Sequence, residues 1–242
     1  PNLKMLGSYF DEIELLLFES KDIESLFPNS VIEALKCISN DLDIGYSIHL
    51  PTDISISTGD TRLQFDAIEC YKKTIDRMLP LAPSAFFLHV PYEEPDAKYP
   101  TVEKWRQRIK ANLRQLLDSA VDAPLVSVET LDYPVDFIED IVQELDLSLC
   151  MDVGHLLLYG YDILDIFRKH SSRIISIHLH GVEKNQDHLG LDHLPQRYIS
   201  AVMEILRPFR GILSIEVFSF QHLIPSLRTL ENWWNSSNRF SN

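Results

Sequence analysis

The sequence lacks an apolar run long enough to span a membrane, and it lacks the N-terminal pattern of a signal peptide. Its three cysteines, Cys37, Cys70 and Cys150, lie in apolar surroundings and show no pairwise spacing. We therefore expect reduced thiols in the protein core, no membrane partner and a cytoplasmic location.

Positive charge is also scarce, because 22 Lys and Arg residues stand against 36 Asp and Glu, for a net charge of −14. Binding to duplex DNA relies on many contacts between Lys or Arg and phosphates. The charge balance therefore disfavours a nucleic-acid partner. It does not disfavour a small phosphate ester that is held by bound cations.

The chain also has no internal repeat, low-complexity tract or change in composition that would mark a linker. A length of 242 residues, of which 45% are hydrophobic, suits one large domain with a sizeable core. We expect a single domain over residues 1–235, followed by a polar C-terminal tail over 236–242.

Short apolar runs alternate with longer amphipathic ones along the whole chain. Strands are expected at 12–20, 44–51, 84–91, 123–130, 147–153, 173–181 and 211–218. Helices are expected at 30–42, 62–79, 134–145, 162–170 and 195–206, in a segment that Thr101 caps, and through Trp233 and Trp234. This alternation predicts an α/β fold with a parallel sheet, and the length favours a TIM-type (β/α) barrel. About seven strands are visible where a closed barrel has eight, and the chain starts at Pro1, so we expect the first strand to be missing.

Side chains able to bind a metal stand at the ends of these strands. They are His49, His89, Glu129, Asp152, His178 and Glu216. Their spacing matches that of strand–helix units, so each belongs to a different strand. The carboxyl ends of the strands of a parallel barrel share one face, so we expect these groups to converge there.

Each of these residues also has a structural explanation when taken alone. A single histidine at a strand end is usually a hydrogen-bonded core or rim residue, and Asp152 could cap a helix that starts near Gly154. Six equivalent positions make independent explanations improbable. Three carboxylates close together in a low-dielectric site would repel one another, and divalent ions remove that repulsion.

Further candidates follow the strand ends. His155 lies three residues after Asp152, and His180 lies two residues after His178, on the same side of that strand. We expect a polar loop over 181–195, which is too long for a simple connection, and Asp187 and His188 are its site candidates, ahead of Asp192 and His193.

Two cations near this segment, Lys184 and Arg197, could bind a phosphate. Residues of this type are, however, more often solvated charges on the protein surface. We expect Cys150 to be a small core residue.

The candidate ligands are carboxylates and imidazoles without a thiolate, a set that suits Zn²⁺, Mn²⁺, Fe²⁺ or Co²⁺ without choosing between them. Such a site supports either the attack of a metal-activated water on an ester or metal-assisted proton transfer on a sugar carbonyl.

The succession SIHLP, FLHVP, VSVET, CMDVGH, SIHLHG and LSIEVF resembles the xylose isomerase-like superfamily of TIM barrels, which includes the type-IV apurinic endonucleases. The resemblance covers nearly the whole chain and implies a metal core of Glu129, Asp152, His178 and Glu216. It also implies that His49 and His89 complete a second metal site. His155 and the pair Asp187–His188 match a third-metal position, but the endonucleases have Asp-x-His there, so this chain departs from the pattern. The family barrel has a strand before the one at 12–20.

A narrower resemblance, to the cobamide-remodelling phosphodiesterases, rests on IELLLFES, VETLDYP, MDVGHLLLYGYD, IHLHGV and DHLGLDHL. It implies a corrinoid substrate whose nucleotide-loop phosphodiester is cleaved to cobinamide phosphate and an α-riboside, with two or more divalent ions per site. The candidate catalytic residues are Glu129, Glu216 and His155. The candidate substrate-binding residues are His180, Lys184 and Arg197.

Three other functions stay open. One is a sugar isomerase or epimerase in which Glu129 and Glu216 move protons beside a single metal. Another is an apurinic-site endonuclease, which the negative charge disfavours. The last is a corrinoid- or metal-binding protein without catalysis. The sequence predicts no oligomeric state.

Overall fold

The computed structural model describes the whole chain except residues 1, 18, 21–26, 119–120 and 238–242. Residue 18 of the expected first strand and most of the expected polar tail therefore lie outside the described residues. No helix in the described ranges is long and apolar enough to cross a membrane. Contacts along the chain group it into two compact units, and the single-domain expectation stays a prediction.

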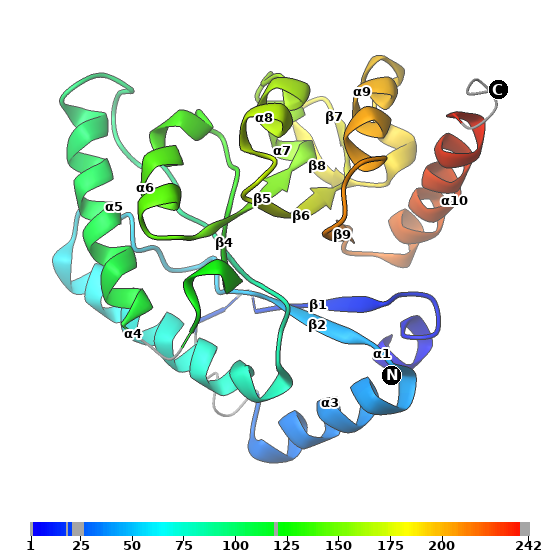
Figure 1. The fold of residues 1–242 in the computed structure, drawn as a ribbon, viewed down its shortest axis with the longest axis horizontal. Helices are drawn as coiled ribbons and strands as arrows, with labels where there is room; N and C mark the ends of the chain where they lie inside the picture. The colour runs from blue at the N-terminus through cyan, green and yellow to red at the C-terminus, as the bar shows by residue number, and fades with distance from the viewer. Residues whose placement is uncertain (1, 18, 21–26, 119–120, 238–242) are drawn as a thin grey trace. The chain divides into compact units, whose positions relative to one another are not determined.

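The first unit comprises Pro1–Glu129 and Asp136–Ser148. Its parallel strands are β1 (Glu12–Leu16), β2 (Gly45–His49), β3 (Phe86–Leu88) and β4 (Val126–Glu129), paired in that order. Its helices are α1 (Asn2–Leu6), α3 (Asn29–Leu42), α4 (Thr61–Met78), α5 (Thr101–Leu117) and α6 (Glu139–Glu144), with short 3₁₀ turns η1 (Leu79–Leu81) and η2 (Ala123–Leu125). Figure 1 shows α3 running alongside β1 and β2.

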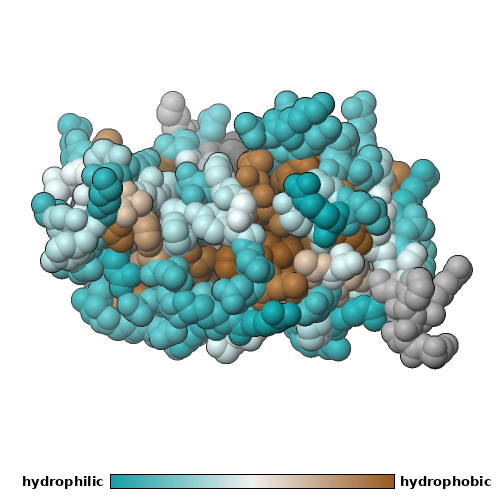
Figure 2. Space-filling view, turned by 90° about the horizontal axis from the view of Figure 1, so that it is seen from above, coloured by the Kyte–Doolittle hydropathy of each residue, from teal (hydrophilic) through white to brown (hydrophobic). Residues whose placement is uncertain are grey.

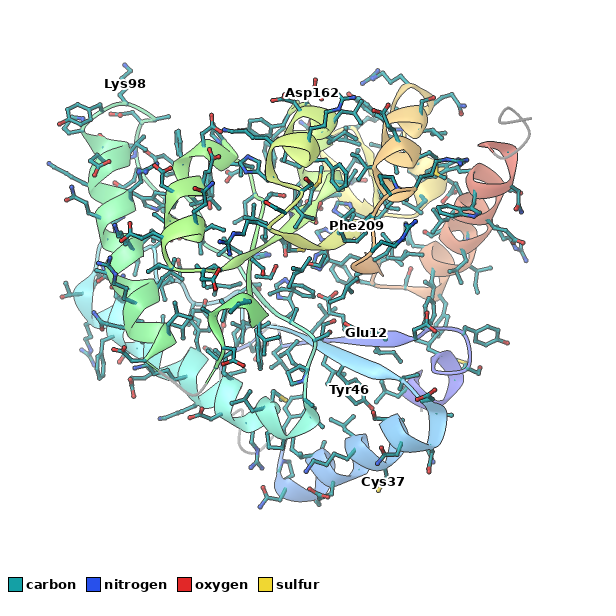
Figure 3. All side chains as sticks on the ribbon, viewed as in Figure 1. Glu12, Cys37, Tyr46, Lys98, Asp162 and Phe209 are labelled. Atoms are coloured by element: carbon teal, nitrogen blue, oxygen red, sulfur yellow. The ribbon has the colours of Figure 1, made fainter. Side chains whose placement is uncertain are left out.

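Local chemistry explains the main elements of this unit. Asp60 caps α4 by accepting hydrogen bonds from the backbone N–H groups of Arg62 and Leu63. Tyr46, labelled on β2 in Figure 3, is buried, and its hydroxyl donates to the carbonyl of Leu35 in α3 at 3.0 Å. Apolar packing and this hydrogen bond together hold α3 against the strand.

The second unit comprises Thr130–Val135 and Leu149–Asn242. Its parallel strands pair in the order β5 (Ser148–Asp152), β6 (Ile174–Leu179) and β9 (Ile212–Ile215). Its helices are α7 (Val153–Leu158), α8 (Ile163–His170), α9 (Gln196–Leu206) and α10 (Phe220–Ser237), and a 3₁₀ turn, η4 (Leu191–His193), precedes α9. Asp162, labelled at the start of α8 in Figure 3, caps that helix through the N–H groups of Leu164 and Asp165.

The predicted α/β class with parallel strands is confirmed, and several local predictions are wrong. Thr101 does not cap α5, because it is the first helical residue and follows Pro100. The segment expected as a loop over 181–195 contains an antiparallel hairpin of β7 (Gly181–Glu183) and β8 (Gln186–Leu189). The helix expected at 134–145 is shorter, with a 3₁₀ turn, η3 (Val135–Phe137), before α6.

The cysteine prediction is correct in one part and wrong in another. No disulfide joins the three residues, and Cys150 is buried as expected. Cys37, however, is exposed on α3, because that helix turns Ile32 and Leu35 inward. The surface seen in Figure 2 is largely hydrophilic, with apolar side chains visible between the polar ones.

The buried hydroxyl of Tyr71 holds the segment that follows β2 in place. The hydroxyl of Tyr71, in α4, donates to the carbonyls of Pro51 at 3.1 Å and Ile54 at 2.8 Å. Burial raises the pKa of Tyr71, so the hydroxyl stays neutral and keeps its proton as a donor.

We predict that Tyr71→Phe lowers the free energy of unfolding by about 1–2 kcal/mol, because the carbonyls of Pro51 and Ile54 lose their donor. Urea denaturation followed by circular dichroism measures the change. Tyr9→Phe is the control, since Tyr9 is 79% exposed. Equal stability of the two variants would show that the phenol does not hold this segment.

Candidate metal-binding site

The first unit brings two histidines and a glutamate together at the ends of neighbouring strands. His49 ends β2, His89 follows β3 and Glu129 ends β4. His49 Nε2 lies 3.3 Å from Glu129 Oε2, and His89 Nε2 lies 3.1 Å from Glu129 Oε1. Glu129 is fully buried, and the two imidazole rings meet edge to face at 4.8 Å. These three residues form the first-unit triad.

The hydrogen bonds of His49 fix which of its nitrogens is a donor. Nδ1 lies 3.0 Å from the carbonyl oxygen of Leu50, which can only accept, so Nδ1 carries the proton. In the neutral ring the lone pair of Nε2 then faces a carboxylate oxygen of Glu129. Two electron-rich atoms at this distance repel each other unless a positive charge, a proton or a metal ion, stands at that place.

The second unit places three more candidate ligands at strand ends. Asp152 ends β5, His178 lies near the end of β6, and Glu216 follows β9. Asp152 pairs in register with His178, so their side chains point to the same face of the sheet. His178 Nδ1 lies 3.0 Å from Glu216 Oε2, and both residues are buried.

Asp152 also caps α7, which was the alternative role expected for this residue from the sequence. A carboxylate that caps a helix can still bind a metal ion through its other oxygen. Asp152 Oδ1 accepts the backbone N–H of His155 at 2.7 Å. His180 Nε2 lies 3.1 Å from the same oxygen. His180 Nδ1 accepts the backbone N–H of His188 at 2.9 Å, so Nε2 carries the ring proton and donates to Asp152. His180 thereby orients the Asp152 carboxylate, as a residue behind a metal ligand does.

The β7–β8 hairpin adds Asp187 and His188. His188 Nδ1 lies 3.1 Å from Asp187 Oδ1, and its Nε2 lies 3.6 Å from Glu216 Oε1. Asp187 Oδ2 is 3.7 Å from His155 Nε2. The His188 ring stacks on His180 at 4.3 Å, and Phe218 stacks on the ring of His188 at 4.8 Å.

The carboxylates of Asp187 and Glu216 favour a positive charge beside His188. Burial acts to lower the pKa of His188, but the carboxylates of Glu216 and Asp187 outweigh it and raise the pKa to about 9. Burial likewise acts to raise the pKa of Asp187, but the hydrogen bond from His188 and the nearby imidazoles lower it. Asp152, His155 and His188 offer ligand atoms that lie within 4.8 Å of one another, and a ring nitrogen of His180 belongs to the same group.

Two of the expected substrate-binding residues do not join these clusters. Lys184 is exposed in the turn of the hairpin, with its Nζ 3.6 Å from Glu183. Arg197 is exposed on α9 beside Tyr198. His193, the weaker site candidate, contacts Glu183 at 3.2 Å.

The sequence interpretation missed two residues that position the ligands. Thr130 Oγ1 accepts the backbone N–H of Asp152 at 2.9 Å. Gly154, in the first turn of α7, leaves room for the His180 ring, which a methyl group at this position would overlap. A glycine between Asp152 and His155 is a sequence signal of such a close approach.

The donor set fits divalent ions in each unit. The first-unit triad offers two imidazole nitrogens and a buried carboxylate. The second unit offers carboxylates and imidazoles supported by Thr130 and His180. Nitrogen and oxygen ligands of this kind suit Zn²⁺, Mn²⁺, Fe²⁺ or Co²⁺.

Residues 3–240 match the sequence model of the xylose isomerase-like TIM barrel family, and the chain belongs to this family. The predicted TIM-type barrel is thereby confirmed. No curated protein sequence matches the chain.

Three solved structures illustrate the fold. A D-tagatose 3-epimerase-like protein is 16% identical, with a TM-score of 0.75 over 95% of this chain and 90% of that one. Endonuclease IV from Thermus thermophilus is 13% identical, with a TM-score of 0.74 over 97% and 93% of the two chains. The 3-keto-D-glucoside 4-epimerase from E. coli is 12% identical, with a TM-score of 0.70 over 97% and 94%. At these identities the likeness shows the fold.

We predict that Gly154→Ala weakens metal binding by about 10–100-fold, because the added methyl group displaces His180 from Asp152. Calorimetric titration of the metal-free protein with Zn²⁺ or Mn²⁺ measures the loss. Gly59→Ala is the matched control, since nothing lies within 4 Å of its added carbon. If both variants bind metal as the unchanged chain does, His180 does not position a ligand.

Proposed function

We propose that the protein is a metal-dependent phosphodiester hydrolase that acts on the nucleotide loop of a cobamide. The observation that carries the proposal is the first-unit triad of His49, His89 and Glu129. An isomerase that uses one metal needs Glu129 and the second-unit ligands, but it has no use for His49 and His89. These two additional imidazoles suit a hydrolase that uses two or more ions.

When bound, divalent ions supply Lewis acidity for activating water and for stabilising the phosphate and the leaving oxygen. In the proposal, His49, His89 and Glu129 would hold one ion, and Asp152, His178 and Glu216 would hold another. His155, Asp187 and His188 would bind the phosphate or a further ion. Water adds across one P–O bond, which gives a phosphate monoester and an alcohol.

The substrate class rests on the motif resemblance to cobamide-remodelling phosphodiesterases and on charge. A net charge of −14 disfavours a long polyanion, but it is compatible with a substrate that carries a single internal phosphodiester. Cobinamide phosphate and an α-riboside are the expected products.

A sugar isomerase or epimerase is the second candidate. Glu129 and Glu216 are both buried, as carboxylates that move protons on a sugar would be. In that reading one ion suffices, and the two glutamates act as acid and base.

We predict that the metal-reconstituted protein releases a riboside from an adenosylcobamide. Glu129→Gln should abolish this turnover with the fold intact, because the amide is a poor metal ligand. Liquid chromatography of the products and circular dichroism of the variant check both statements. Glu33→Gln is the control, since Glu33 is exposed. Full turnover by Glu129→Gln would refute its assignment.

We also predict at least two tightly bound ions per chain. A His49→Ala/His89→Ala variant should lose one ion, because Glu129 alone cannot replace two imidazole ligands, and His193→Ala should lose none. Elemental analysis after gel filtration counts the ions. One ion in every variant, together with ketose interconversion, would favour the isomerase.

A further inference from the structure

A pocket of about 520 Å³ in the second unit lies outside the ligand clusters. Its walls come from the end of α7, the turn of the β7–β8 hairpin, η4 and the start of α9. This volume is within the range of small-molecule sites.

The pocket shares two elements with the candidate metal ligands. Leu158, on its wall, follows His155 by three residues on α7, which is roughly 5 Å along a helix. Lys184, at the hairpin turn, precedes Asp187 by three residues, which span at most about 10 Å. A phosphate at the ligand cluster and a group bound in the pocket can therefore be neighbouring parts of one substrate.

The lining is half apolar and half polar. Leu157, Leu158 and the ring of Tyr198 provide apolar surface, and Asn185 adds an amide that can donate and accept hydrogen bonds. The guanidinium of Arg197 lies over the Tyr198 ring at 4.6 Å and donates to its hydroxyl at 3.1 Å.

The charges on the lining balance. Two cations, Lys184 and Arg197, are matched by two acids, Glu183 and Asp192. Lys184 Nζ already lies 3.6 Å from Glu183. Such a lining offers no net attraction for an anion, so it suits an uncharged group with several hydroxyls.

The backbone at the turn holds Lys184 in a conformation that lysine seldom adopts. Lys184 and Asn185 have φ angles of 49° and 66°, in the left-handed region. Asparagine tolerates this region, whereas lysine is disfavoured there and glycine has no steric penalty. The two-residue turn between Glu183 and Gln186 requires positive φ at both positions, and it places the lysine at the rim of the pocket.

We infer that this pocket binds the riboside portion of the substrate, a planar heteroaromatic ring that carries a ribose. The inference rests on the proposed function and names the part of the substrate that lies beside the phosphate. The ring packs on the leucines and Tyr198. The ribose hydroxyls bond to Asn185, Lys184 and Arg197, so these two cations contact hydroxyl groups rather than steadying the phosphate.

The test is calorimetric binding of benzimidazole riboside to the metal-loaded full chain, with ribose and inorganic phosphate as comparison probes. We expect saturable binding of the riboside, weakened at least 10-fold in a Lys184→Gly/Arg197→Gln variant. Phosphate binding should be unchanged in that variant. Arg168→Gln, which removes an exposed charge on α8, is the control and should bind the riboside normally.

The single variant Lys184→Gly shows whether a loss of riboside binding is caused by a loss of folding. Glycine suits the turn, so its melting temperature should be unchanged or raised by up to about 3 °C while riboside affinity falls. Absence of riboside binding, equal binding in the double variant, or loss of phosphate binding instead would overturn the inference.

Turnover assays separate this inference from the proposed function. Riboside binding that the double variant loses, without cobamide hydrolysis by any form, would support the pocket and reject the hydrolase. Cobamide hydrolysis with the same KM in the double variant and the unchanged chain would support the hydrolase and overturn the pocket.

Discussion

The structure depends on one electrostatic constraint, the burial of carboxylates at the ends of parallel strands. Glu129 and Asp152 are completely buried, and Glu216 nearly so. A bare carboxylate is very costly to bury, and each of these three lies against at least one imidazole. The neutral ring of His49 turns a lone pair toward Glu129 and does not compensate that charge, whereas a divalent ion between them would. The donor chemistry of both units therefore points to cations.

Short elements of the second unit carry several roles at once. The helix α7 is capped by Asp152, presents His155 and contains Gly154, whose missing side chain admits His180. The β7–β8 hairpin presents Asp187 and His188 on one strand and Lys184 at its turn. A change that moves either element therefore alters ligand geometry and the neighbouring pocket together. In the proposed function, the site that binds the phosphate and the pocket that recognises the attached riboside would therefore share the same two elements.

Strand ends were predictable because the signal is local: an apolar run that stops at a histidine or a carboxylate. The grouping of His49, His89 and Glu129 follows from that pattern and from parallel pairing. The hairpin over 181–195 was not predicted, because its strand residues Gln186–Leu189 are polar and show no β-branched alternation. The support by Thr130 and the stacking of Phe218 on His188 depend on packing between elements far apart in the sequence, which periodicity does not report. The alternation of strands and helices and the chain length predicted the barrel, and family membership confirmed it.

The most direct test of the central claim is anomalous X-ray diffraction from crystals of the zinc-loaded protein, measured on both sides of the zinc edge. The account predicts peaks about 2.0–2.2 Å from imidazole nitrogens and carboxylate oxygens of His49, His89, Glu129, Asp152, His178 and Glu216. Peaks confined to other parts of the surface, with these side chains still in direct ion pairs, would contradict it.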